Sequence, residues 1–261
     1  MPFYERDGVR YYQFSSLNVP KITHAIFTRQ GGSSPSPWDS LNLGGTVGDD
    51  PQRVAENRHR AFRAVGRTFT SLFDVWQVHS ARVVKVTMPH TSLENILKAD
   101  AMVTNRTEPT LLMRFADCVP LLFYDPVQGA IGLAHAGWQG TVRKVALATV
   151  NALREHYATK PADIIAAIGP SIGPDHYEIG PDVIAEVERA FPTEASTLLH
   201  SENGAVKLDL WQANKFTMQQ AGITKIEVAK ICTACNLDDW YSHRAENGRT
   251  GRFGALIALK P

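Results

Sequence analysis

The sequence has few cysteines and no excess of charge of either sign. Three cysteines among 261 residues are too few, and odd in number, for a disulfide framework. Lysine and arginine number 27 against 26 acidic residues, and a net charge of +1 gives no field that could hold a phosphate polymer. We therefore expect free thiols or metal-binding cysteines, and no nucleic-acid partner.

Long apolar runs are also absent. No run approaches the roughly 20 residues that span a bilayer, and the first ten residues lack the basic-then-apolar order of a signal peptide. These absences predict a cytoplasmic protein with no membrane partner. The hydrophobic content of 44% suffices for a substantial core. No linker divides the chain, so we expect a single domain over residues 1–261.

Short apolar runs separated by turn residues fill most of the chain. Composition and punctuation predict strands within residues 71–86, 99–105, 110–118, 120–126, 129–138, 163–169, 205–210, 225–233 and 252–259. Apolar spacing and helix-start signals predict helices over residues 51–65, 141–157, 181–191 and 211–222. Because several strands follow one another directly, an α+β fold with a mixed sheet is favoured over regular βαβ alternation.

One cysteine and two histidines lie beside polar or glycine breaks at the ends of predicted strands. These are His79 in QVHS, Cys118 in FADC and His135 in AHAGW. A catalytic zinc site takes three such ligands and leaves a fourth position for water or substrate. Two other interpretations stay open at this point. The side chains can be buried packing residues, or Cys118 and His135 can form a thiolate and base for acyl transfer.

The other two cysteines form the sequence C-T-A-C. Cys232 and Cys235 have the spacing of a redox dithiol, but no helix pattern follows them as it does in such motifs. A zinc ribbon would need a second pair of cysteines, which the sequence lacks. A structural or incidental role is the better interpretation for both.

A series of motifs along the chain resembles the YfiH / laccase-domain family. The motifs occur in the family's order between about His24 and Leu259: FTRQGG, NLGGTVGDDP with ENR, QVHS, ADAMVT, ADCVPLLFYDP, AHAGWQGT, IGPSIGPDHYEIG, and CTAC with SHR and TGR. Family members are named as polyphenol oxidases and as purine nucleoside phosphorylases with adenosine deaminase activity.

The resemblance implies a fold, a metal site and a set of activities. The fold is a layered α/β/β/α sandwich similar to toxin deamidases that use a Cys-His pair. The metal ligands, usually for zinc, are His79, Cys118 and His135. The implied substrates are purine nucleosides, including adenosine, inosine and methylthioadenosine, with phosphate. A copper-dependent polyphenol oxidase and a Cys-His hydrolase remain alternatives, although nine histidines without a His-x-His pair are few for a multicopper relay.

Further residues are expected around the reaction. Beside Cys118 and His135, Asp117 is a candidate proton shuttle, although strand alternation can turn it to the opposite face. Expected substrate contacts are Arg29 and Arg244 for phosphate, and Asn42 and Gln77 for sugar or base. Two departures from the family pattern, Gln139 in the HAGW turn and Ala245 after SHR, each remove a candidate basic contact, so we expect weaker phosphate binding.

Overall fold

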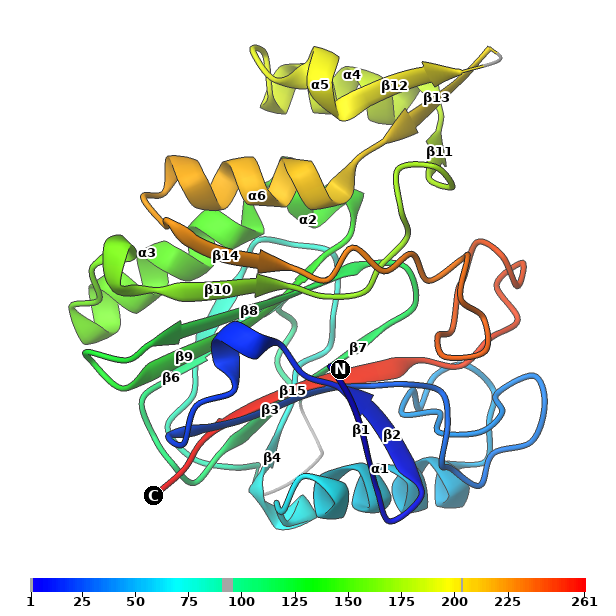
Figure 1. Cartoon of the computed structure of the whole chain (residues 1–261), viewed down its shortest axis with the longest axis vertical. Helices are drawn as coiled ribbons and strands as arrows, with labels where there is room; N and C mark the ends of the chain where they lie inside the picture. The colour runs from blue at the N-terminus through cyan, green and yellow to red at the C-terminus, as the bar shows by residue number, and fades with distance from the viewer. Residues whose placement is uncertain (1, 91–95, 203) are drawn as a thin grey trace.

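The computed structural model describes residues 2–90, 96–202 and 204–261. Figure 1 shows two stacked sheets with helices on both outer sides, and a smaller unit beyond α6. The helices are α1 (Pro51–Ala64), α2 (Trp138–Val142), α3 (Val145–Tyr157), α4 (Pro181–Ala190), α5 (Ala195–Leu198) and α6 (Leu210–Gln220). Within the residues that the structure describes, no helix is long and apolar enough to cross a membrane.

The two main sheets have six strands each and a mixed topology. The first runs β1 (Phe3–Arg6), β2 (Val9–Tyr12), β3 (Ile22–Phe27), β15 (Phe253–Leu259), β7 (Thr110–Phe115) and β4 (Leu72–Phe73). The second runs β14 (Lys225–Val228), β10 (Ile165–Ile168), β8 (Val119–Asp125), β9 (Ala130–Ala136), β6 (Ala101–Thr104) and β5 (Val83–Lys85). A small third sheet joins β11 (Glu178–Ile179), β13 (Ala205–Leu208) and β12 (Leu199–Glu202).

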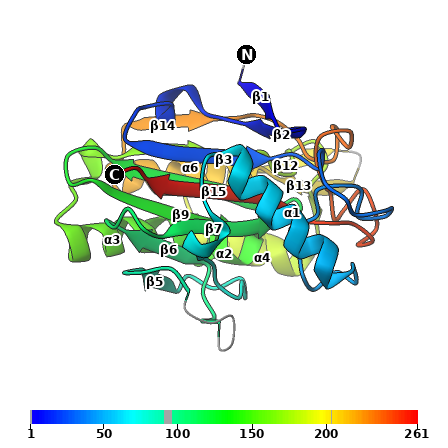
Figure 2. The ribbon, with the colours of Figure 1, turned by 90° about the horizontal axis from the view of Figure 1, so that it is seen from below.

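The core lies in three apolar layers. Every residue of β8, β9 and β15 is buried, as expected for strands covered on both faces. Side chains such as Met113 and Leu133 fill the space between the two sheets. Figure 2 shows α1 lying over the first sheet. Phe62 of α1 packs in the apolar cluster on the outer face of that sheet, and Leu153 of α3 packs in the cluster on the second. This order of layers confirms the predicted α/β/β/α sandwich.

One local prediction was wrong. The helix predicted over 141–157 is broken into α2 and α3, because Lys144 adopts a left-handed conformation with φ 60°. The two strands predicted within 71–86 are present, but β4 joins the first sheet and β5 the second. His79 lies in the connection between them, as predicted. The hairpin of β1 and β2 was not predicted.

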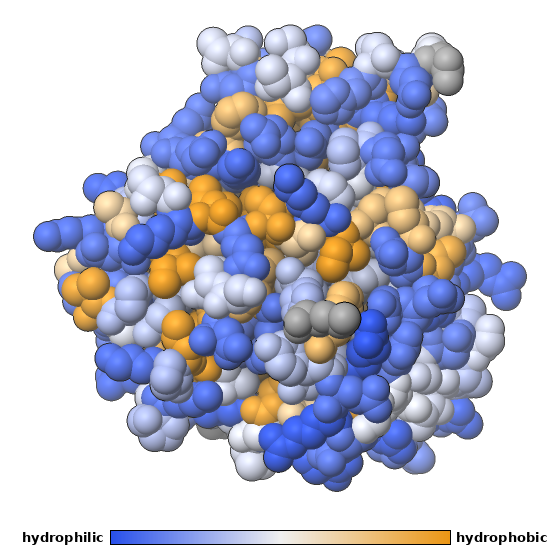
Figure 3. Space-filling view, in the orientation of Figure 1, coloured by the Kyte–Doolittle hydropathy of each residue, from blue (hydrophilic) through white to orange (hydrophobic). Residues whose placement is uncertain are grey.

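The surface seen in Figure 3 is mostly hydrophilic, with apolar residues scattered in small areas. A cavity at the ends of β8 and β9 is lined by three residues that can carry chemistry, His79, Asp117 and Cys118.

Candidate metal centre and its pocket

The β8–β9 hairpin brings two of the candidate ligands together. Cys118 immediately precedes β8 and Gly137 immediately follows β9, and the register Val119↔Ala136 places them opposite each other. His135 is buried within β9. Gly137 has no space for a side chain, because a Cβ there would lie 2.8 Å from the Cys118 sulfur and 3.1 Å from Cδ2 of His79. The glycine therefore leaves room for the two neighbouring side chains.

The third candidate, His79, lies in the loop that enters β5. Its backbone is left-handed, with φ 58°, a conformation that is uncommon outside glycine and clusters at functional sites. Two contacts hold it there: the His79 N–H donates to the Asp100 carboxylate at 2.9 Å, and Arg143 donates to the His79 carbonyl at 2.5 Å.

Asp100 connects the two histidines. The β6–β9 register places it opposite His135, whose Nδ1 lies 3.0 Å from Asp100 Oδ1. The same carboxylate accepts hydrogen bonds from the backbone N–H groups of residues 78–80. A carboxylate on Nδ1 fixes the proton there and leaves Nε2 of the imidazole free to accept a metal or a proton.

The three candidate ligands converge. One donor atom each from His79, Cys118 and His135 lies within 4.8 Å of the other two. The Cys118 sulfur is 4.0 Å from Nε2 of His79, and the two imidazole rings meet edge to face with centroids 5.0 Å apart. Their geometry and chemistry fit a small, borderline-soft cation such as zinc.

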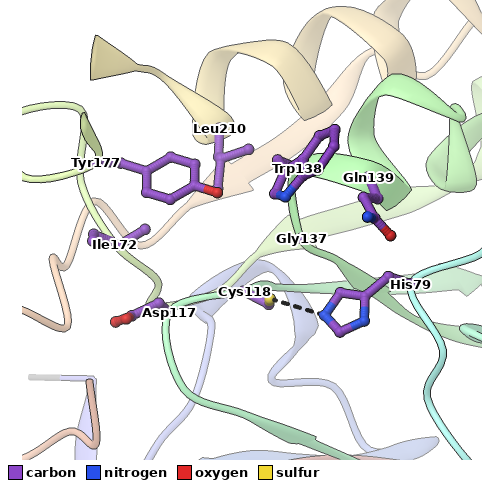
Figure 4. Close-up of a pocket in the computed structure, with 9 residues that line it drawn as sticks. All are labelled: His79, Asp117, Cys118, Gly137, Trp138, Gln139, Ile172, Tyr177 and Leu210. Carbon is purple, nitrogen blue, oxygen red and sulfur yellow. Dashed lines mark hydrogen bonds between the residues drawn. The ribbon is translucent and has the colours of Figure 1, made fainter. Parts of the chain in front are cut away.

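A cavity of about 260 Å³ opens onto two of these residues. His79 and Cys118 line one side, and Figure 4 shows the Trp138 and Tyr177 rings flanking the space beside them. The remaining lining residues are Asp117, Gly137, Gln139, Ile172 and Leu210. Apolar walls with a few polar groups are typical of small-molecule sites.

Mutual interactions shift the pKa values of the buried pair. Burial disfavours both charged forms, but the interactions of Cys118 with His135 and His79 outweigh it and lower the thiol pKa to about 6. For His135, burial is outweighed by Cys118 and Asp100, which raise its pKa to about 9. Without a metal, these interactions favour the thiolate form of Cys118 together with the imidazolium form of His135.

Asp117 lines the pocket, but both of its oxygens are engaged. Oδ1 accepts from the Thr233 hydroxyl at 2.7 Å, and Oδ2 accepts from the Arg244 backbone N–H at 2.7 Å. In Figure 4 the carboxylate points away from the Cys118 sulfur. Arg244 does not line the pocket; its guanidinium lies 5.3 Å from the ring of the lining residue Tyr177 and donates to the Glu178 carbonyl at 2.9 Å.

The other three expected substrate contacts are also absent from the lining of the pocket. Arg29 contacts Asp39, Leu237 and Glu246, and borders a different, open hollow. Asn42 is fully buried, where its amide organises a loop through Gly44, Asp49 and Arg252. The Gln77 amide exchanges two hydrogen bonds with the backbone of Arg114.

The sequence suggested the Gly137–Trp138 turn as part of the wall of the site, and both residues line the pocket. Asp100 and Tyr177 carried no assigned role in the sequence. Asp100 had a usable signal, since it is an acidic residue directly before a buried strand in the ADAMVT motif. Tyr177 had none, because it reaches the pocket through a loop whose path depends on distant contacts.

The fold and the site define a class: layered α/β/β/α proteins in which two histidines and a cysteine meet at a pocket. Comparison with known families shows which family within this class the chain belongs to. The chain belongs to the family described as multi-copper polyphenol oxidoreductase laccase, the YfiH family, whose model matches residues 23–260.

Named relatives and solved structures agree with this membership. The chain is 34% identical to purine nucleoside phosphorylase YlmD of Bacillus subtilis over 258 residues, covering 94% of this chain and 91% of the relative. It is 39% identical to a purine nucleoside phosphorylase of Deinococcus radiodurans, covering 97% and 94%. The crystal structure of YlmD from Geobacillus stearothermophilus superposes with a TM-score of 0.92 at 31% identity, covering 100% and 99%.

The donor groups do not match a multi-copper cluster. Within residues 2–90, 96–202 and 204–261, only two groups of at least three His, Cys, Asp or Glu side chains could hold an ion. One is the His79, Cys118 and His135 group, and the other contains a single histidine. A relay of several copper ions needs many more imidazoles, so the site fits one ion.

Proposed function

We propose that this protein is a zinc-dependent purine nucleoside enzyme. It cleaves adenosine, inosine and methylthioadenosine with phosphate, and it deaminates adenosine. The observation that carries the proposal is the His79, Cys118 and His135 group beside an aromatic-walled pocket. The names of relatives at 34–39% identity support the substrate class.

His79, Cys118 and His135 would hold the metal. Bound there, zinc would supply a Lewis acid next to the pocket. Asp100 orients His135 by keeping the proton on Nδ1, and it fixes the loop of His79 through three backbone N–H groups. Copper could use the same donors, but the single-ion site favours a hydrolytic or group-transfer reaction over multi-electron oxidation.

The pocket walls suit a purine. The flat rings of Trp138 and Tyr177 offer stacking surfaces, and Ile172 and Leu210 exclude water. The amide of Gln139 provides both a donor and an acceptor for the edge of a base or a ribose hydroxyl.

Phosphorolysis requires an anion below the ribose ring. A phosphate oxygen bonds to C1′ while the bond from C1′ to the base breaks, and the departing base takes up the proton that the phosphate loses. The products are the sugar 1-phosphate, which is ribose 1-phosphate for adenosine and inosine, and the free base. Arg244 is the residue we assign to phosphate, because its guanidinium lies beside the lining residue Tyr177 and donates to a neutral group, the Glu178 carbonyl. The Arg29 guanidinium instead borders another hollow and is paired with the Glu246 carboxylate. We assign Asp117 to positioning, since its carboxylate fixes the Arg244 backbone.

A Cys-His hydrolase is the second candidate. The lowered pKa of Cys118, to about 6, and the raised pKa of His135, to about 9, favour a nucleophilic thiolate in the metal-free protein. In a Cys-His hydrolase, the Asp100–His135 hydrogen bond would orient His135 as the base. The two candidates differ in whether metal is required.

Product analysis tests the proposal. The purified protein, with its zinc and copper content measured, is incubated with adenosine with and without phosphate. We expect inosine in both cases, and adenine with ribose 1-phosphate only when phosphate is present. Cys118→Ala should abolish all products, and Arg189→Ala, at an exposed site, is the matched surface control. Full zinc occupancy with no product above the Cys118→Ala background would refute the proposal, and activity that survives chelation would favour the hydrolase.

A further inference from the structure

A second cluster of metal-binding side chains lies on two loops outside the pocket lining. It contains Asp175, His176, Cys232 and Cys235, each contributing one donor atom within 4.8 Å of the other three. The loops meet because Ser171 and Cys232 form a parallel β-bridge, in which the Thr233 N–H donates to the Ser171 carbonyl at 3.1 Å. This cluster includes both cysteines of the C-T-A-C motif.

The spacing of the donors matches a tetrahedral zinc ion. Bond lengths of about 2.3 Å to sulfur and about 2.0–2.1 Å to nitrogen or oxygen place tetrahedral S and N or O ligands about 3.5 Å apart. Nδ1 of His176 lies 3.5 Å from the Cys235 sulfur and 3.8 Å from the Cys232 sulfur. The Cys235 sulfur lies 3.6 Å from Asp175 Oδ2.

Hydrogen bonding alone does not account for this convergence. Nδ1 of His176 faces two sulfurs and, at 3.0 Å, the Asp175 carboxylate. A ring nitrogen carries one proton or one lone pair, so it can satisfy only one of these three partners well. A cation at the centre satisfies all four donors together.

The surroundings support a built site. The Gly173 N–H donates to the Cys232 sulfur at 3.2 Å, as backbone groups do for metal-bound thiolates. A side chain on Gly173 would lie 2.5 Å from Asp175 Oδ1 and 3.1 Å from the Cys232 Cβ, so glycine is required for the donors to approach.

We propose that Asp175, His176, Cys232 and Cys235 form a second, structural zinc site with four protein ligands. The ion joins the loop before Tyr177 to the loop containing Thr233. Tyr177 lines the first pocket, and the Thr233 hydroxyl donates to Asp117. The second zinc therefore holds part of the pocket wall in place. The inference does not depend on which reaction the pocket performs.

Metal analysis of the full-length protein tests the site. The protein is purified under reducing conditions and its zinc content is measured for wild type, Cys118→Ala, Cys235→Ser and the double variant. One ion for each of the two donor groups is expected in wild type. Each single variant should keep one ion and the double variant none. His176→Ala should behave as Cys235→Ser, while His200→Ala, at another exposed histidine, should keep both ions.

Two further measurements use the Cys118→Ala background. Cobalt added to the metal-free protein should give a thiolate charge-transfer band that weakens when Cys235 is also replaced. Added zinc should raise the Tm of Cys118→Ala but not of the Cys118→Ala, Cys235→Ser double variant. A folded Cys118→Ala protein without zinc, or thiol titration that shows Cys232 and Cys235 joined in a disulfide, would overturn the proposal.

Discussion

The molecule carries two clusters of metal-binding side chains that differ in number of donors and in surroundings. The first has three donors, from His79, Cys118 and His135, and it adjoins a cavity. The second has four donors on surface loops, and none of these four residues lines that cavity. Three ligands leave a coordination position for a substrate, whereas four close the ion off from chemistry.

The groups that hold the donor side chains in place also differ between the two clusters. Asp100 is fully buried and binds three backbone N–H groups as well as His135, which fixes the first cluster rigidly. In the second cluster, the His176 and Asp175 side chains are 45% and 59% exposed, so the metal itself must supply most of the order. We therefore assign reactivity to the first cluster and loop stabilisation to the second.

Replacing Cys118 should give the largest effect on activity. Cys118→Ala removes one of three ligands, and a catalytic metal contributes several kcal/mol to the transition state, so kcat/KM should fall about 10³-fold or more. Cys235→Ser removes a donor that does not line the pocket, and its loss should be much smaller. Steady-state kinetics with adenosine and phosphate measure kcat/KM for both variants. Equal losses in the two would contradict the assignment of reactivity to the first cluster alone.

Gly137→Ala should lower kcat/KM about 10²-fold. The new Cβ in Gly137→Ala would lie 2.8 Å from the Cys118 sulfur, and misplacing a reacting group by about 1 Å costs roughly this factor. Gly180→Ala is the matched control, since nothing lies within 4 Å of its Cβ and its φ is −85°. Comparable kinetics of the two variants would mean that Gly137 does not shape the site.

Asp100→Asn should lower zinc affinity at the first cluster by roughly 10–100-fold, the usual cost of losing a carboxylate behind a histidine ligand. Affinity is measured by competition with a chromophoric chelator in a Cys235→Ser background, which isolates the first cluster. Asp182→Asn, at the exposed start of α4, serves as control. Unchanged affinity in Asp100→Asn would show that the carboxylate does not act through His135.

The sequence allowed the first cluster to be predicted better than its surroundings. His79, Cys118 and His135 lie in short motifs at strand ends, and the structure brings them together. Asp100 meets His135 only through the β6–β9 register, which no local pattern specifies. Arg29 looked like a phosphate ligand, but its partners Leu237 and Glu246 come from the distant C-terminal part of the chain.

The fold was predicted from composition and family motifs. Where this prediction differs from the structure, the difference has a local cause. The break at Lys144 is invisible to helical periodicity, because the apolar stripe continues across it. The second cluster was also missed. Cys232 and Cys235 have no second cysteine pair, and their partners Asp175 and His176 lie on a separate loop that only the β-bridge at Ser171 brings near.

The smallest expected effect is a difference between Cys118 and Cys235 in how the rate of alkylation depends on pH. In metal-free protein, burial opposes ionisation of Cys118, but His135 and His79 outweigh it and lower the pKa to about 6. At Cys235, burial, Cys232 and Asp175 all raise the pKa. A thiolate forms above its pKa, so Cys118 alkylation should rise about tenfold from pH 5 to pH 8 and then level off.

Cys235 should show no such plateau, because at pH 8 it is still mostly protonated. Alkylation by iodoacetamide at each cysteine is followed by mass spectrometry after chelation, and added zinc should protect both sites. A midpoint for Cys118 near the ordinary thiol value of about 8.5 would mean that His135 does not pair with it as an imidazolium. That outcome would remove the support for a Cys-His hydrolase and leave metal binding as the only chemical role for the pair.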